Sequence, residues 1–205
     1  MASNLFTLIK NRRSVRKFSS KKVPSDVIQR VFDVTRWAPS AHNSQPWRFV
    51  VIDDFDTKQQ LAKAMAMKWK EDLQKDGTDS VFLENFVADS VKRFSGPPVL
   101  VVVCLGMKEM DSYPDKKRRQ AEYVMGTQSV GAATQNLLLA VHGEGLAACW
   151  FCAPLFCPET VRNVLGIPEN VYPQALITVG YPDEVPKAPP RKPLDNILYQ
   201  NRWGQ

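Results

Sequence analysis

Apolar residues recur along much of the chain with the spacing of an α-helix. Where apolar side chains stand three and four positions apart, they gather on one face of a helix. A serine, aspartate or proline before such a segment favours a helix start, and a following proline favours its end. This pattern predicts helices at Ser3–Asn11, Pro24–Ala38, Thr57–Gln74, Ser80–Phe94, Lys116–His142 and Pro158–Leu165.

Short, continuous apolar runs lie between several of these helices. Runs of this kind are typical of strands that are buried on both faces. They predict strands at Trp47–Asp53, Pro98–Leu105, Leu146–Phe151 and Ala175–Tyr181. Strands that are separated by helices predict an α/β or α+β sheet with helices on both faces, within a single domain that spans residues 1–205.

The long helix and the end of the chain add two further expectations. Residues Val130–Val141 are apolar almost all round the helix, which predicts that this half is buried. The tail Pro182–Gln205 holds many of the prolines and is predicted to be extended. Such a tail cannot enter the interior of a central strand, although it can reach across to another subunit.

The chain has 205 residues, a net charge of +6 and ordinary globular composition. No run of about 20 apolar residues predicts a membrane span. The N-terminus lacks a signal-peptide pattern, so we expect a cytoplasmic protein. The basic residues are scattered apart from Arg12–Lys17 and Lys116–Arg119, and no nucleic-acid-binding motif accompanies them. The charge therefore favours an anionic small ligand over nucleic acid as the partner.

Four cysteines, two of them spaced as Cys149-Trp-Phe-Cys152, raise the question of a metal or redox site. A zinc site needs a second ligand pair, and the two histidines, His42 and His142, stand far apart with no ligand pattern around them. Pro154 crowds the turn where a thioredoxin-like motif opens its helix. The pattern therefore favours buried or half-buried thiols in a reducing compartment and predicts no metal site.

The first segment with candidate chemistry is the basic connector Arg12-Arg13-Ser14-Val15-Arg16-Lys17-Phe18. Guanidinium groups bind phosphate through paired, charge-assisted hydrogen bonds, and a serine hydroxyl adds a donor. Each hydrogen bond to a charged group contributes about 1.5–3 kcal/mol. Taken alone, however, this segment is more typical of a solvated basic turn.

A second candidate segment, Ala38–Trp47, connects a predicted helix to a predicted strand. Ser40, Asn43 and Gln45 offer neutral donors and acceptors that suit a heteroaromatic edge or a polyol chain. Pro39 helps to fix the path of the backbone, so that these side chains are held in place. The alternative interpretation is an ordinary helix-to-strand loop.

A third candidate segment, Gly145–Ala153, ends a predicted strand and can present backbone groups to a flat ligand. Arg191, near the end of the chain, offers a further charge for a phosphate. Each of these features is weak on its own, and only their combination favours one function.

In this order, the segments resemble the nitroreductase (flavin reductase) family. The resemblance covers about Leu5–Leu198 and rests on R-R-S-x-R-x-F, P-S-x-x-N-x-Q-P-W, G-L-x-x-x-W and a G-Y-P tail with Arg191. It implies an α+β sandwich with a central, mainly antiparallel sheet flanked by helices. It also implies an intertwined homodimer with one FMN per subunit at the interface.

The resemblance also implies roles for individual residues around the FMN. One set matches positions that hold the phosphate, the ribityl chain and the pyrimidine edge, with a late phosphate contact: Arg12, Arg13, Ser14, Val15, Arg16 and Arg191. A loop set, partly from the other subunit, matches flavin contacts: Pro39, Ser40, Asn43 and Gln45. A third set matches a stretch along the ring: Trp150, Cys152 and Ala153. Cys152 stands where some members carry glutamate, and Ala153 where some carry glycine.

The family chemistry is carried by the flavin, while the protein supplies binding, stacking and charge. The resemblance thus implies that NADH or NADPH reduces the FMN, which reduces a flat acceptor such as a nitroaromatic or a quinone. No catalytic acid or base is required, and Arg16 is the candidate for stabilising the reduced flavin. The sequence has no G-x-G-x-x-G fingerprint, which agrees with transient nicotinamide binding on the flavin.

A closer resemblance links residues 69–77, 112–119 and 145–150 to the C-terminal flavin domain of the γ-glutamyl ligase that matures the deazaflavin coenzyme. It implies that Asp72 contacts a deazaflavin substrate, and an exposed helix acid is an equal alternative. Three other functions stay open: reduction of a deazaflavin precursor or another specialised flavin reaction, a non-catalytic flavin-binding module, and nucleic-acid binding on charge alone.

Overall fold

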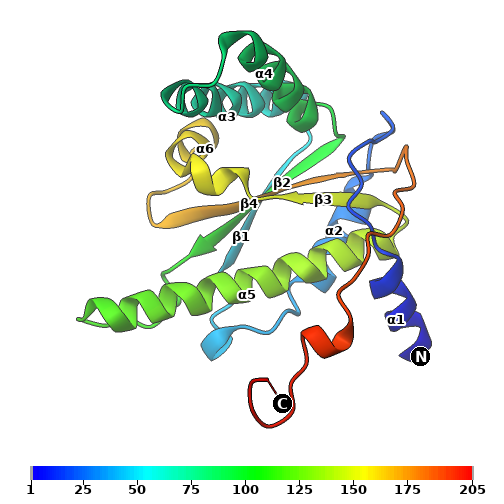
Figure 1. Cartoon of the computed structure of the whole chain (residues 1–205), viewed down its shortest axis with the longest axis vertical. Helices are drawn as coiled ribbons and strands as arrows, with labels where there is room; N and C mark the ends of the chain where they lie inside the picture. Colours follow the sequence, from blue (N-terminus) through cyan, green and yellow to red (C-terminus); the bar gives the residue numbers. More distant parts are fainter. Residues whose placement is uncertain (1, 205) are drawn as a thin grey trace.

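The computed structural model describes residues 2–204, and a four-stranded sheet lies at its centre (Figure 1). The strand order is β1-β2-β4-β3, and every neighbouring pair is antiparallel. The strands are β1 (Trp47–Ile52), β2 (Val99–Gly106), β3 (Ala147–Phe151) and β4 (Val171–Gly180). An antiparallel sheet between helices confirms the expected α+β fold.

Two groups of helices cover the two faces of the sheet, as Figure 1 shows. Helix α2 (Ser25–Thr35) and the long helix α5 (Lys116–Gly143) pack on one face. Helices α3 (Phe55–Lys75), α4 (Ser80–Ser95) and α6 (Pro158–Leu165) lie over the other face. The continuous apolar strands explain this arrangement, because each face has its own row of side chains to bury.

Alternate residues of β2 supply two separate hydrophobic cores. Successive side chains of a strand point to opposite faces of a sheet. One row faces the core of α2 and α5: Val99, Val101, Val103 and Leu105. The other row faces the core of α3 and α6: Leu100, Val102 and Cys104. The central strands β2 and β4 are therefore buried on both faces, as their sequences predict.

Helix α2 ends earlier than its proline predicts. Its last residue is Thr35, although the expected end lay just before Pro39. The amides of Trp37 and Ala38 then donate to carbonyls three residues back, which tightens the chain into a turn. A short 3-10 turn, η1 (Ala41–Asn43), follows before β1 begins. Hydrogen bonds within this turn therefore end the helix at Thr35, before the position that Pro39 predicts.

Strand β4 begins four residues before its predicted start at Ala175. Pro173 lies in this extension opposite Cys104, beside a shift in the register between β2 and β4. The shift leaves Gln174 as an extra residue on β4, which defines a β-bulge. A proline is tolerated at a bulge because the regular ladder of hydrogen bonds is already interrupted there.

Both ends of the described chain leave apolar side chains on the surface. Helix α1 (Ala2–Asn11) and the tail beyond β4 expose Leu5, Phe6, Ile9, Leu194, Ile197, Leu198 and Trp203. Figure 1 shows the tail running away from the sheet past α5, and its regular structure is limited to the short turn η3 (Leu194–Asn196). Within residues 2–204, no helix combines the length and apolar character that a membrane span requires.

Candidate functional site

The basic segment lies along the edge of β3. Ser14 forms a parallel bridge with Ala148, and the amide of Val15 donates to the Ala148 carbonyl at 3.1 Å. The side chain of Val15 is buried, so it anchors this extended stretch to the core. The structure therefore brings together the first and third candidate segments, which stand far apart in the sequence.

Two arginines of this segment line a small cavity of about 210 Å³ together with His142 and the start of the tail. Arg13 donates through Nη1 to the carbonyls of Lys10 at 2.6 Å and Arg12 at 2.8 Å. Burial lowers the pKa of His142, and the charges of Arg12 and Arg13 lower it further. These shifts indicate a cationic environment that favours an anionic ligand over a second cation.

Three arginines act on the buried thiol of Cys149 in β3. Burial raises the pKa of Cys149, while the charges of Arg16 and Arg12, a hydrogen bond with Ser14 and the charge of Arg93 act in the opposite direction. Arg93 belongs to α4, whereas the other groups belong to the basic segment. Positive charge from two elements thus converges on the same strand.

The start of the tail fixes the position of the basic segment. The amides of Arg16 and Lys17 donate to Oε1 of Glu184, at 2.7 and 3.2 Å. The amide of Asp183 also donates to the Lys17 carbonyl at 3.0 Å. Further along, Arg191 is exposed, and its guanidinium donates to the carbonyls of the two prolines before it. Arg191 therefore lies outside the contacts that hold the basic segment.

A second and larger cavity, of about 420 Å³, lies where α3 and α4 meet the end of β3. Its aromatic lining consists of Trp69, Phe94, Phe151 and Phe156. Phe94 packs edge-on against Phe151, with ring centroids 5.2 Å apart, which gives the cavity a firm wall. Cys152 and Ala153 complete the wall at the end of β3. A cavity of this size and character suits a flat aromatic ligand.

Charged side chains stand at the rim of this aromatic cavity. Asp72 pairs with Lys68, and its carboxylate lies 3.8 Å from Nζ of Lys75. The hydrogen bond with Lys68 holds the pKa of Asp72 below its ordinary value. Arg93 also lines the cavity, so the positive charge near β3 extends to its mouth. Asp72 is thus a half-buried helix acid that lines the cavity, and its contact with a deazaflavin stays a prediction.

One of the three residues that are predicted to lie along the flavin ring is outside both cavity linings. Trp150 is partly exposed on β3 and belongs to neither cavity lining, because its neighbour Phe151 points into the aromatic cavity and side chains alternate along a strand. Conversely, Trp69 and Arg93 line the aromatic cavity although neither was predicted as a site residue. In the sequence, Trp69 is an aromatic residue in an otherwise polar helix segment, and it begins the 69–77 segment that carries the closer resemblance.

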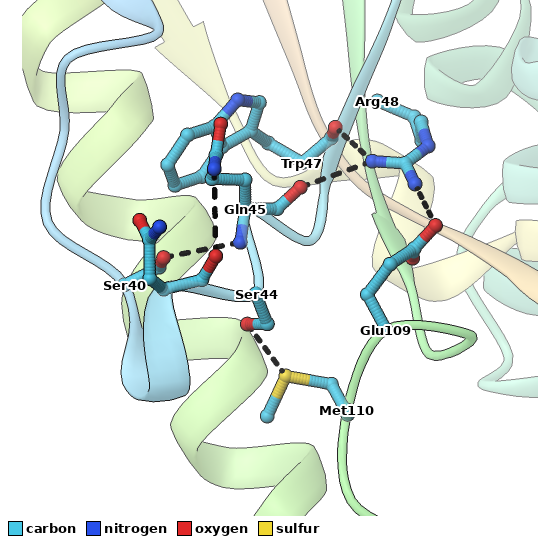
Figure 2. A network of polar contacts seen from close by, with 8 residues as sticks. Ser40, Ser44, Gln45, Trp47, Arg48, Glu109 and Met110 are labelled. Atoms are coloured by element: carbon cyan, nitrogen blue, oxygen red, sulfur yellow. Dashed lines mark hydrogen bonds and ion pairs between the residues drawn. The ribbon is translucent and has the colours of Figure 1, made fainter.

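The loop set lies near α5, within a network of polar contacts that Figure 2 shows. His42, Asn43 and Gln45 have φ angles of 55°, 52° and 48°. Each such residue costs on the order of 1–3 kcal/mol, and this strain clusters at functional sites. The amide of Gln45 donates to Oγ of Ser40 at 3.0 Å, which supports the strained turn. Pro39, Asn43 and Gln45 are exposed and therefore available to a ligand or a second subunit.

The cysteines differ more than their sequence spacing predicts. All four thiols are free, and burial raises the pKa of Cys104 to about 12 and that of Cys157 to about 11. Such thiols are inert near neutral pH. Cys152, by contrast, is exposed, which corrects the expectation that all the thiols are buried or half-buried. Cys152 follows the last residue of β3, and its side chain lines the aromatic cavity.

This arrangement agrees with the match of residues 9–181 to the nitroreductase family. The match covers most of the chain, and the protein belongs to the nitroreductase family.

Individual relatives and solved structures support the same assignment. The iodotyrosine deiodinase of Haliscomenobacter hydrossis is 34% identical over 198 residues, which cover 89% of this chain and 81% of the relative. A BluB-like flavoprotein from Clostridium difficile 630 matches with a TM-score of 0.76 and 27% identity, over 95% of this chain and 97% of that one. An FMN-dependent nitroreductase from Mycobacterium smegmatis, solved in complex with NADPH, shares the fold with a TM-score of 0.74 and 24% identity, over 98% and 99% of the chains.

Proposed function

We propose that the protein is an FMN-dependent oxidoreductase that uses NADH or NADPH to reduce a flat aromatic acceptor. The observation that carries this proposal is the position of β3, which lies beside the basic segment and ends at an aromatic cavity. A ligand with an anionic end and a flat end suits both features. Membership of the nitroreductase family supports the same cofactor class.

The residues present fit an FMN molecule. Arg12, Arg13 and Ser14 offer guanidinium and hydroxyl donors that would hold the phosphate and the ribityl chain. Cys152 and Ala153 would lie along the ring, and Arg16 would stabilise negative charge on it. When bound, the flavin supplies hydride transfer, whereas the protein excludes water and orients the acceptor. No side chain is assigned as a proton donor in this proposal.

We also propose that the site is completed in a homodimer. Exposed apolar residues on α1 and on the tail, among them Phe6 and Trp203, favour burial against a second copy of the chain. The loop with Pro39, Ser40 and Asn43 lies on α5 rather than at the aromatic cavity, so its expected flavin contacts need the partner subunit. Sedimentation equilibrium at micromolar concentration tests this: twice the mass of one chain is expected, and a monomer contradicts it.

The aromatic cavity predicts how the protein treats its acceptor. Trp69→Ala removes a ring that is partly exposed to the cavity and lies 5.9 Å from the ring of Phe86. A lost stacking contact of about 0.5–1.5 kcal/mol raises the KM for a nitroaromatic or a quinone about two- to tenfold. Steady-state NAD(P)H oxidation with each acceptor measures this. Trp37→Ala is the matched control, because Trp37 is 77% exposed on the opposite side of the sheet. Equal KM values in the two variants would contradict the assignment of the cavity.

Two other acceptors have specific support. The iodotyrosine deiodinase relative, at 34% identity, favours reductive removal of a halogen from a halogenated tyrosine as a second candidate reaction. The position of Asp72 in the cavity lining keeps a deazaflavin coenzyme or its precursor as a candidate substrate. Turnover with a panel of a nitroaromatic, a quinone, a diiodotyrosine and a deazaflavin distinguishes these. The acceptor with the highest kcat/KM identifies the reaction class, and no turnover with any of them favours a non-catalytic flavin-binding module.

A further inference from the structure

Three side chains with metal-binding atoms meet beside α5, away from the linings of both cavities. His42 comes from η1, Asp111 from the loop before α5, and Glu122 from the second turn of α5. Nε2 of His42 lies 3.5 Å from Oε1 of Glu122 and 3.9 Å from Oδ2 of Asp111. One ligand atom of each residue lies within 4.8 Å of the other two. No sequence motif predicts this group, because both carboxylates lie far from the histidine along the chain.

Glu122 gives the group a buried charge that is incompletely paired. Its side chain is 5% exposed, and its Oε2 atom has no hydrogen-bond partner among the described residues. A buried carboxylate oxygen in this state carries a large desolvation cost, and native proteins rarely leave one unpaired. The contact with His42, at 3.5 Å, is at the outer limit of a hydrogen bond and involves the other oxygen. A cation at this point would neutralise the charge and satisfy the carboxylate.

Hydrogen bonds fix the two loops that carry the exposed members of the group. The amide of Ala41, one position before the histidine, donates to Oγ of Ser129 on α5 at 3.1 Å. Oγ of Ser44 lies 3.1 Å from Sδ of Met110, one position before the aspartate (Figure 2). Both loops are therefore held relative to each other and to α5. Ligands on such a fixed scaffold lose little conformational freedom when a metal binds.

We propose that His42, Asp111 and Glu122 bind a divalent transition-metal cation, with Zn²⁺ as the best match. One imidazole and two carboxylates are typical nitrogen and oxygen ligands for this ion, and the two carboxylates balance its charge. Metal–ligand distances of about 2.0–2.2 Å in a tetrahedral site separate the ligand atoms by about 3.4 Å. The separations of 3.5 and 3.9 Å at the histidine nitrogen are close to this value. Small side-chain rotations complete the site, and water takes the fourth position.

The cation would stabilise the loop that carries Ser40, Asn43 and Gln45. Residues 42, 43 and 45 have positive φ angles, so this loop stores backbone strain that other contacts have to offset. A metal that joins His42 to α5 supplies such a contact. No step of the proposed flavin reaction uses the cation, and the site therefore stands independently of that function.

Calorimetric titration of the 205-residue protein with ZnCl₂ near neutral pH, with and without added FMN, tests the proposal. We expect saturable binding of one Zn²⁺ per chain, and zinc-edge X-ray absorption with only nitrogen and oxygen ligands at about 2.0 Å. Asp111→Asn is the principal variant, because this side chain is 58% exposed and its replacement leaves the core intact. The loss of one ligand is expected to weaken Zn²⁺ binding at least about tenfold, and His42→Ala is expected to act in the same direction.

Glu109→Gln is the matched control for these variants. Glu109 lies in the same loop, but it pairs with Arg48 at 2.6 Å instead of with the histidine (Figure 2). This variant is expected to bind Zn²⁺ as tightly as the unaltered protein. Sulfur ligands in the absorption spectrum would assign the ion to the cysteines and overturn the proposal. The absence of saturable binding, or binding that Asp111→Asn and His42→Ala leave unchanged, would overturn it as well.

Discussion

Replacing Arg13 with alanine is expected to weaken FMN binding at least tenfold. Its guanidinium is held by the carbonyls of Lys10 and Arg12, and it lines the cationic cavity beside β3. A hydrogen bond between a guanidinium and a phosphate contributes about 1.5–3 kcal/mol, and about 1.4 kcal/mol corresponds to a tenfold change in affinity. The double variant Arg12→Ala/Arg13→Ala is expected to lose at least about a hundredfold. Fluorescence titration of the flavin-free protein with FMN measures both losses.

Arg36→Ala serves as the control for the loss of one positive charge. Arg36 is exposed at the end of α2, where it pairs with Asp33 at 2.7 Å, and it belongs to neither cavity lining. Its replacement changes the net charge as Arg13→Ala does, so a general electrostatic effect would weaken FMN binding in both variants. If Arg13→Ala binds FMN with unchanged affinity, the basic segment does not hold the phosphate.

The second large effect is expected at the centre of the sheet. Ile177→Ala should lower the free energy of unfolding by about 2–5 kcal/mol, because it removes buried methyl groups and leaves a cavity. Ile177 is fully buried in β4, where it pairs with Val101 of β2 on one side and with Trp150 of β3 on the other. Packing from both neighbouring strands leaves little room for collapse around the shortened side chain. Chemical denaturation at a fixed excess of FMN measures the change.

Val185→Ala is the matched control for this stability measurement. Val185 is 96% exposed in the tail, so the loss of its methyl groups is expected to change the free energy of unfolding by less than about 0.5 kcal/mol. A loss at Ile177 no larger than the loss at Val185 would mean that β4 is not the centre of the core.

The sequence predicted the elements wherever local pattern alone determines them. Helix α6 has the predicted bounds, and the predicted strands all exist with ends shifted by at most one residue, except at the start of β4. The early start of β4 depends on the bulge at Gln174, next to Pro173, which forms only because β2 lies opposite. The end of α2 at Thr35 likewise depends on hydrogen bonds in the following turn, and the position of Pro39 does not predict these bonds. Both differences arise from contacts in the folded chain, which the intrinsic helix and strand propensities of the residues do not describe.

The candidate site was predictable where short motifs carry it. The sequence singles out Asp72 in one segment and Cys152 with Ala153 in another, and the structure brings all three to one cavity. Arg93 escaped prediction because its role depends on how α4 packs against β3, which leaves no local signal. The sequence does not predict the cluster around His42 for the same reason, since its carboxylates come from distant parts of the chain. Patterns in sequence thus identify ligand-binding segments better than they identify the neighbours those segments acquire on folding.

The central claim, that this protein is a flavin reductase, is tested most directly by its visible absorbance spectrum before and after anaerobic addition of NADPH or NADH. The proposal predicts the absorption bands of bound flavin in protein purified or reconstituted with FMN, and predicts that the reduced nicotinamide bleaches them. Flavin bands that persist after both donors are added would contradict reduction by NAD(P)H. A protein that cannot be loaded with FMN would contradict the proposed cofactor itself.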